Sequence, residues 1–133
     1  MPRFVSKIST LSEAFKANRT GMLALTTKLE ELNGRSFLES EKRKPRFEER
    51  GQLTPRERLS RLLDPGMPFL EIGNMAGYLL DTNDPEKSVP GGSVIAGIGF
   101  VASARVAIVV DDSGINAGAM TQAGGYRLRR CQE

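Results

Sequence analysis

Apolar residues recur at helical spacing in the first quarter of the chain. Intervals of three, four and seven residues place five of them on one helical face: Phe15, Met22, Leu25, Leu29 and Leu32. Thr10 and Glu13 have the spacing of a capping box, and Asn33 and Gly34 are a typical left-handed stop. The pattern predicts a helix over residues 10–33 that docks on its own domain or on a partner.

A second, shorter helix is predicted within the stretch GQLTPRERLSRLLDPG, residues 51–66. Thr54 suits the N-cap, Pro55 suits the first helical position, and Glu57 completes a capping box. The buried face is expected to consist of leucines: Leu59, Leu62 and Leu63. Three arginines have no role in this helix itself: Arg56, Arg58 and Arg61. Salt bridges or an interface are the leading interpretation of these arginines, and anion binding is the alternative.

Between the two helices, residues 39–50 mix basic and acidic side chains around Pro45, with only Phe47 to bury. This composition predicts a solvated linker. A basic cluster lies in it and could bind phosphate: Lys42, Arg43, Lys44 and Arg46. The interleaved glutamates would cancel most of the field of that cluster, so a soluble surface is the leading interpretation.

Two runs of strand-forming residues follow a turn-rich loop, DTNDPEKSVPGG. Residues 93–101 and 104–110 are separated only by Ala102 and Ser103, which predicts a β-hairpin. Gly97 and Gly99 indicate that another backbone or a helix packs closely on the first strand.

The second strand leads into a glycine-rich loop and a helix expected to open near Tyr126. Glycines 114, 118, 124 and 125 have neither the dinucleotide-binding nor the P-loop spacing, so a plain connection is the default interpretation. A hairpin and barely two helical turns cannot cover both faces of a sheet. We therefore expect these residues to be the front of a larger domain.

The composition excludes several kinds of catalytic site but does not indicate a particular function. The 133 residues suffice for one modest core, and 39% hydrophobic with 26% charged residues is ordinary for a globular protein. Histidine is absent, which excludes Ser-His-Asp and Cys-His catalysis and histidine-ligated zinc. A net charge of +3 and few aromatic residues make nucleic-acid binding a weak third choice.

Cysteine usage and the N-terminal composition suggest a compartment. Cys131 is the single cysteine, and neither a secretory signal nor a membrane span is evident in the sequence. These features favour a cytoplasmic protein. Arg3 and Lys7 among hydroxyl residues give the first twelve residues a weaker likeness to an organelle transit peptide.

Three blocks taken together resemble a known family: LTPRERLSRLLDPGMPFLEIGNMAG, PGGSVIAGIGFVASARVAIVVDD and RRCQE. They resemble the N-terminal part of the carboxyltransferase β subunit of biotin-dependent acyl-CoA carboxylases, and the methylcrotonyl-CoA and geranyl-CoA branch most closely. The resemblance implies an α/β, crotonase-like fold of β-β-α units, preceded by an N-terminal helical extension. It divides the chain into residues 1–50, a helix and charged linker, and residues 51–133, an incomplete carboxyltransferase domain.

The resemblance also implies a reaction, its cofactor and its partners. An enolate of the acyl-CoA thioester attacks the carboxyl carbon of carboxybiotin, and backbone N–H groups stabilise the oxyanions, which needs neither histidine nor metal. Carboxybiotin is carried on a partner α subunit, and the complete protein is expected to be a homo-oligomer. The family's oxyanion-hole loops lie in segments that this sequence does not contain, so we assign no catalytic residue and expect the chain alone to be inactive.

Within the chain, the resemblance places the strand-to-helix loop along the CoA. The loop residues expected to contact CoA are Gly114, Ile115, Asn116, Ala117 and Gly118. Arg127 stands where the family has lysine and is a candidate phosphate contact, although an exposed, solvated helix face is its leading interpretation. The rival to the enzyme hypothesis is a truncated or degenerate interaction module, whose helix 10–33 and basic linker bind another carboxylase subunit.

Overall fold

The computed structural model describes residues 5–133, so Arg3 of the transit-peptide-like pattern lies outside the described residues. The contacts divide the chain into two compact units, Met1–Glu31 and Leu32–Glu133. Helix α1 (Glu13–Glu41) ends in the second unit. It is followed there by α2 (Lys44–Glu49), α3 (Pro55–Leu62), β1 (Leu70–Glu71), β2 (Val94–Val101), β3 (Ala104–Asp111), the 3₁₀ turn η1 (Asn116–Gly118) and α4 (Gln122–Gln132).

Helix α1 differs at both ends from the helix expected over residues 10–33. It begins at Glu13, and the Ser12 hydroxyl accepts a hydrogen bond from the Phe15 N–H at 3.2 Å. The predicted stop at Asn33 and Gly34 is wrong, because the helix continues to Glu41. From Leu32 onward one helical face is buried, and it consists of Leu32, Ser36 and Ser40. Burial of this face offsets the helix-breaking tendency of the stop.

Most of residues 39–50, for which the composition predicted a solvated linker, are helical. They contain the end of α1 and all of α2, in which Pro45 lies in the first turn, where its missing N–H costs no hydrogen bond. The expected exposure is correct for most of these side chains, and Phe47 is half-buried.

Helix α3 has the predicted capping box. The Thr54 hydroxyl accepts a hydrogen bond from the Glu57 N–H at 3.2 Å, and the Glu57 carboxylate accepts one from the Thr54 N–H at 2.8 Å. Leu59 is buried and Leu63 is half-buried, but Leu62 is 51% exposed, so its assignment to the core was wrong. Leu62 lies about 100° around the helix from Leu63, which turns it away from the sheet.

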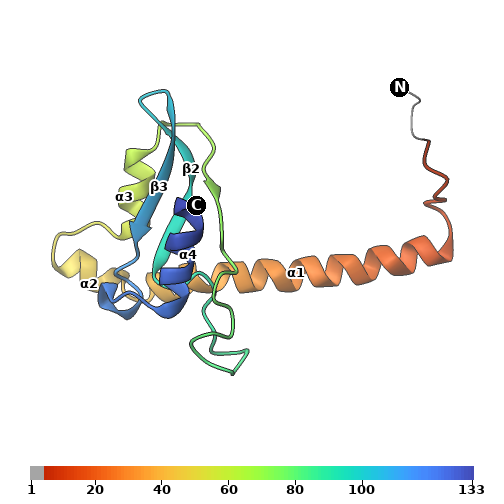
Figure 1. Ribbon diagram of the computed structural model, residues 1–133, viewed down its shortest axis with the longest axis horizontal. Coiled ribbons are helices and arrows are strands. Elements are labelled where there is room, and N and C mark those ends of the chain that lie inside the picture. The colour runs from red at the N-terminus through yellow and green to blue at the C-terminus, as the bar shows by residue number, and fades with distance from the viewer. Residues whose placement is uncertain (1–4) are drawn as a thin grey trace. The chain divides into compact units, whose positions relative to one another are not determined.

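The sheet has the order β1-β2-β3 and is antiparallel throughout (Figure 1). The predicted hairpin is confirmed, with Val101 opposite Ala104. Its turn uses two left-handed residues without a glycine, Ala102 at φ 50° and Ser103 at φ 65°. The Asp64 carboxylate accepts hydrogen bonds from the Ala102 and Ser103 N–H groups at 2.8 and 2.6 Å, which holds this turn in place.

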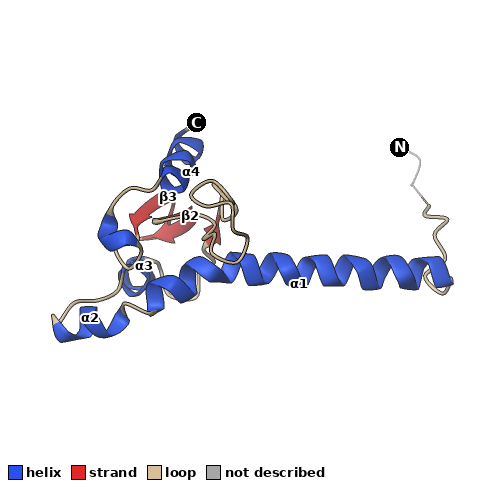
Figure 2. Ribbon diagram, turned by 90° about the horizontal axis from the view of Figure 1, so that it is seen from below, coloured by secondary structure: helices blue, strands red, loops and turns tan. Residues whose placement is uncertain are grey.

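Helices cover both faces of the sheet in the second unit (Figure 2). The face toward α3 forms the core with three buried residues: Leu59, Ile95 and Ile108. On this face Gly97 and Gly99 allow close packing, because a Cβ on Gly97 would lie 2.5 Å from the Leu70 carbonyl oxygen and one on Gly99 would lie 2.5 Å from a Leu63 methyl carbon.

Helix α4 packs on β2 and completes the β-β-α unit expected for the fold. It begins at Gln122, four residues before the predicted start, because the Thr121 hydroxyl caps it by accepting a hydrogen bond from the Gly124 N–H at 2.9 Å. Gly124 and Gly125 are therefore helical residues and not part of the loop.

Candidate functional site

The loop between β3 and α4 is anchored to the end of α1 by a buried carboxylate. Asp112 is nearly inaccessible, and its Oδ1 accepts hydrogen bonds from the Ser40 hydroxyl at 2.7 Å and from the Gly114 N–H at 3.0 Å. A Cβ on Gly114 would lie 2.4 Å from the Ser40 hydroxyl oxygen, so only glycine fits there. These contacts fix the start of the loop against α1.

The loop then makes a strained left-handed turn at η1. Three consecutive residues have positive φ: Asn116 at 47°, Ala117 at 53° and Gly118 at 85°. A left-handed conformation costs a residue such as alanine about 1–2 kcal/mol. Within residues 5–133 the N–H groups of Asn116 and Ala117 have no hydrogen-bond acceptor, and both residues are exposed. Strain of this kind is concentrated at functional sites in proteins.

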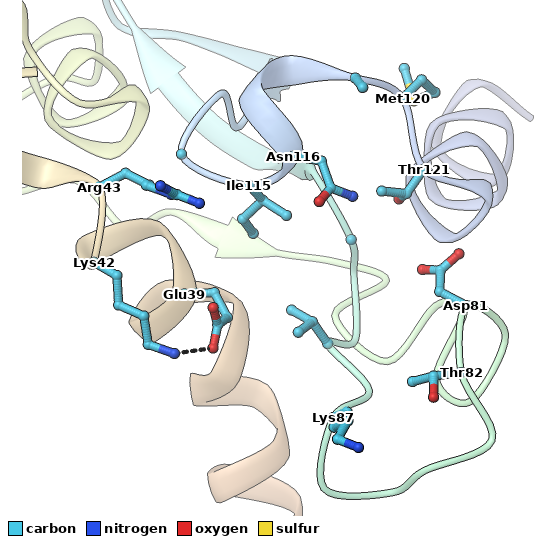
Figure 3. A pocket seen from close by; sticks show the side chains of 14 residues that line it. Glu39, Lys42, Arg43, Asp81, Thr82, Lys87, Ile115, Asn116, Met120 and Thr121 are labelled. Atoms are coloured by element: carbon cyan, nitrogen blue, oxygen red, sulfur yellow. Dashed lines mark hydrogen bonds and ion pairs between the residues drawn. The ribbon is translucent and has the colours of Figure 1, made fainter. Parts of the chain in front are cut away.

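Two cavities flank this turn. The larger, which we call the loop pocket, has a volume of about 570 Å³ and lies between the end of α1, the segment 81–92 and residues 114–121 (Figure 3). The smaller, which we call the arginine pocket, has a volume of about 210 Å³. Its lining residues are Arg43, Arg46, Phe47, Arg50, Gln52, Ser113 and Ala117. Arg43 lines both pockets, and Figure 3 shows it extending toward the turn that carries Ile115 and Asn116.

The structure brings together some of the predicted CoA-binding residues and separates others. Gly114, Ile115 and Asn116 line the loop pocket, whereas Ala117 lines the arginine pocket. Gly118 is exposed and lines neither cavity. Contact of these loop residues with CoA stays a prediction.

Arg127 lies elsewhere, and the expectation that it is exposed was wrong. Its side chain is 1% exposed beneath α4. The guanidinium donates hydrogen bonds to the Ile72 carbonyl at 2.9 and 2.7 Å, to Asn74 Oδ1 at 3.0 Å and to the Val94 carbonyl, and it pairs with Glu71 at 3.0 Å. Sequence periodicity did not reveal this role, because every acceptor lies more than thirty residues away in the chain.

Several basic residues between the end of α1 and α3 form ion pairs. Lys42 pairs with Glu39, and Lys44 pairs with Glu57 at 3.4 Å. The Glu57 carboxylate raises the pKa of Lys44, and hydrogen bonds from Thr54 are the largest cause of the lowered pKa of Glu57. Arg56 pairs with Glu71 at 3.3 Å, as the salt-bridge interpretation expected, and its guanidinium lies 5.5 Å from the ring centre of Phe37.

Residues 46–133 match the family described as carboxyl transferase domain. The chain belongs to this family. It is 39% identical over 79 residues to the biotin-dependent 3-methylcrotonyl-coenzyme A carboxylase beta1 subunit of Mycobacterium tuberculosis, covering 59% of this chain and 14% of that relative. It is 34% identical over 113 residues to the mitochondrial methylcrotonoyl-CoA carboxylase beta chain of Arabidopsis thaliana, covering 80% of this chain and 18% of that relative.

Solved carboxyl transferase structures resemble the chain as well. The beta subunit of geranyl-CoA carboxylase from P. aeruginosa matches with a TM-score of 0.78 and 41% identity, over 88% of this chain and 21% of that one. The transcarboxylase 12S structure matches with a TM-score of 0.60 over 93% of this chain and 22% of that one, and at 23% identity it supports the fold alone. The predicted carboxyl transferase fold is thereby confirmed.

Two further properties of the described residues bear on chemistry and location. Across residues 5–133, no cluster of three or more histidine, cysteine or carboxylate side chains is arranged to hold a metal ion. No helix in the same described range combines the length and apolarity needed to cross a membrane.

Proposed function

We propose that this chain forms part of a carboxyltransferase component that moves a carboxyl group from carboxybiotin to an acyl-CoA. The observation that carries the proposal is the likeness to the geranyl-CoA carboxylase beta subunit, which extends over 88% of the chain. Carboxybiotin supplies the activated carboxyl group. In this reaction the acyl-CoA loses a proton from carbon, and the resulting enolate carbon attacks the carboxyl carbon of carboxybiotin. The bond between that carbon and the ureido nitrogen breaks, and the released biotin takes up the proton on this nitrogen.

The contribution that we assign to this chain is the binding of acyl-CoA along the loop 114–118. Three observations support it: the left-handed turn is exposed, two of its N–H groups have no acceptor among the described residues, and the loop pocket has the volume of a typical cofactor site. Peptide N–H groups in consecutive turn residues suit anionic and carbonyl oxygens. We assign no residue of the chain to biotin and none to catalysis.

The partners follow from the proposed reaction. We propose a biotin-carrying α subunit as donor, and association of the complete protein with copies of itself. The relative from Mycobacterium tuberculosis supports the first of these partners, since it is a beta1 subunit of a biotin-dependent carboxylase. We propose a cytoplasmic location, with a mitochondrial matrix as the alternative that the Arabidopsis relative suggests. Fractionation of cells that express the tagged protein separates the two.

The reaction is tested on the full product of the gene that carries this sequence. Labelled carboxyl transfer from the carboxylated biotin-carrying partner to 3-methylcrotonyl-CoA and to geranyl-CoA is measured. We expect transfer to at least one of the two substrates, and no transfer without the acyl-CoA. Absence of transfer to these and to propionyl-CoA, from a folded protein with a competent donor, would reject the proposed reaction.

The loop assignment is tested with a pair of glycine variants. Gly118→Val and Gly66→Val both force valine into a left-handed conformation, at φ 85° and 77°, and neither Cβ meets a close neighbour. Both should lose similar stability. Only Gly118→Val should raise the KM for acyl-CoA, with little change in the KM for the biotin donor. Equal effects of both variants on the two KM values would show that Gly118 serves the turn alone.

A second candidate function is an interaction module that binds another carboxylase subunit. It is favoured by the exposed apolar face of α1 in the first unit, where Met22 and Leu25 are both 64% exposed and Leu29 is also exposed. Replacing the three residues with glutamine should abolish binding to a biotin-carrying subunit in a pull-down if this candidate is right. Unchanged binding would remove it.

A further inference from the structure

The arginine pocket gathers three cations on one helical face. Arg43, Arg46 and Arg50 are spaced three and four residues apart, so they project from the same side of α2 and its caps. Phe47 lies between them on that face. The opposite wall comes from the strand-to-helix loop, through Ser113 and Ala117. The pocket therefore joins the basic segment to the loop that we assign to acyl-CoA.

The sequence suggested that glutamates cancel the basic charges of residues 39–50, but in the structure acidic residues pair with the two lysines of this segment only. Lys42 and Lys44 are engaged by Glu39 and Glu57. In contrast, Arg43, Arg46 and Arg50 form no ion pair within residues 5–133, and all three are exposed. Of the residues that the structure describes, no acidic one lines the pocket.

Helical geometry determines where the two glutamates of α2, Glu48 and Glu49, lie relative to the arginines. Glu48 lies about 200° around the helix from Arg46 and so faces away from it, whereas Glu49 follows Arg46 by three residues and is its neighbour on the helix surface. Neither glutamate lines the arginine pocket, and neither forms an ion pair within residues 5–133. The face that carries Arg43, Arg46 and Arg50 is therefore cationic, and no ion pair among the described residues neutralises these three charges.

Guanidinium groups at this spacing are suited to phosphate. Each offers a planar fork of N–H donors that matches two phosphate oxygens, and such charge-assisted hydrogen bonds are stronger than neutral ones. Ala117 adds a backbone N–H without an acceptor in the described chain, on the opposite wall. These donors surround a cavity of about 210 Å³, which has room for phosphate and part of a nucleotide but not for a whole CoA.

We propose that the arginine pocket binds the phosphate groups at the adenosine end of the acyl-CoA. This inference rests on the proposed function, because it takes the ligand of the neighbouring loop to be CoA. The acyl end then extends away from α2 along the loop. Arg46 and Arg50 are binding residues in this proposal, and they take no part in the carboxyl transfer itself.

The test uses the full gene product and two charge-neutralising double variants. Arg46→Gln with Arg50→Gln removes two cations from the pocket, whereas Arg58→Gln with Arg61→Gln removes two exposed cations from α3 as the matched control. The dissociation constants for CoA, adenosine 3′,5′-bisphosphate and the nucleotide-free pantetheine thioester are measured by calorimetry. Melting temperatures confirm that both variants are folded.

We expect the pocket variant to weaken CoA and adenosine 3′,5′-bisphosphate by about tenfold or more, because each lost charge-assisted hydrogen bond has that order of effect. Binding of the pantetheine thioester should not change, and the α3 control should match the wild type. Unchanged CoA binding in the pocket variant, or an equal loss for the pantetheine thioester, would overturn the proposal.

A second pair of variants approaches the pocket from its other wall. Asparagine and aspartate both tolerate the left-handed conformation of Ala117 and have nearly the same size. Ala117→Asp should therefore weaken CoA binding severalfold more than Ala117→Asn, since only aspartate adds negative charge to the pocket. Equal affinities of the two variants for CoA would count against a phosphate at this place.

Failure of the proposed function gives a different result from failure of this inference. If wild-type protein transfers carboxyl groups and the pocket variant keeps its KM for acyl-CoA, the function stands and the arginine pocket is not its phosphate site. If wild-type protein shows no transfer but binds adenosine 3′,5′-bisphosphate in an Arg46- and Arg50-dependent way, the phosphate site stands and the reaction is wrong. Competition by inorganic phosphate alone, without any preference for the nucleotide, would reject the adenosine end of CoA as the ligand.

Discussion

Replacement of Arg127 by methionine should destabilise the second unit severely. Methionine keeps much of the apolar stem of arginine and removes its charge and all its donors. In the native protein the guanidinium connects α4 to the segment after β1 and to β2, through Ile72, Asn74 and Val94. The variant therefore tests whether this buried cation holds α4 to the sheet.

The size of the expected loss of stability follows from the burial of the Arg127–Glu71 ion pair. Arg127 is 1% exposed and Glu71 is 22% exposed at the side chain, and the two lie 3.0 Å apart. Removing one partner of a buried, hydrogen-bonded ion pair costs about 3–5 kcal/mol, because the other charge and the carbonyl acceptors stay buried without partners. Glu71 retains Arg56 at 3.3 Å, which places the expected loss at the lower end, about 3 kcal/mol.

The assay is urea unfolding followed by circular dichroism, with Arg130→Met as the control. Arg130 lies on the same helix, is exposed, and pairs only with Glu133 at 3.6 Å within the described residues, so its loss should change the free energy of unfolding by less than about 0.5 kcal/mol. Equal stabilities of the two variants would refute the reasoning. Loss of acyl-CoA affinity at unchanged stability in Arg127→Met would instead support the phosphate contact predicted from the sequence.

Five further substitutions test local features of the fold by the same unfolding assay. Ala117→Gly should stabilise the protein by about 1 kcal/mol, because glycine removes the left-handed strain at φ 53°, and a loss of stability would contradict that. Gly97→Val should cost about 1–3 kcal/mol through its 2.5 Å approach to β1 and Phe69, whereas Gly125→Ala, which meets no neighbour, should gain up to about 1 kcal/mol. Thr54→Ala should cost about 0.5–2 kcal/mol by removing the cap of α3. The lowered pKa of Glu57 means that its stabilising contribution is present above the ordinary carboxyl pKa and is lost as the pH falls through the lowered value, so Glu57→Gln should lessen the acid sensitivity of unfolding.

The features that the sequence determined by itself are local ones. The capping box of α3 needs only Thr54 and Glu57, three residues apart, and the hairpin needs only two strand-forming runs with a two-residue gap. Their hydrogen bonds close within a few residues, so the pattern of side chains decides them. The family was also evident from the order of several such blocks, and the match over residues 46–133 agrees with it.

Other features were decided by contacts between residues far apart in the chain. Helix α1 passes through Asn33 and Gly34 because its last turns are buried, with Ser40 hydrogen-bonded to Asp112. Arg127 is buried because its acceptors come from two other segments, and no periodicity within α4 shows them. The charges of residues 39–50 cancel along the sequence, but in the folded protein Glu39 and Glu57 pair with the lysines while Arg43, Arg46 and Arg50 line the arginine pocket. Only the folding of the chain brings such groups together or separates them, because electrostatic and packing energies depend on distance in space rather than on distance along the sequence.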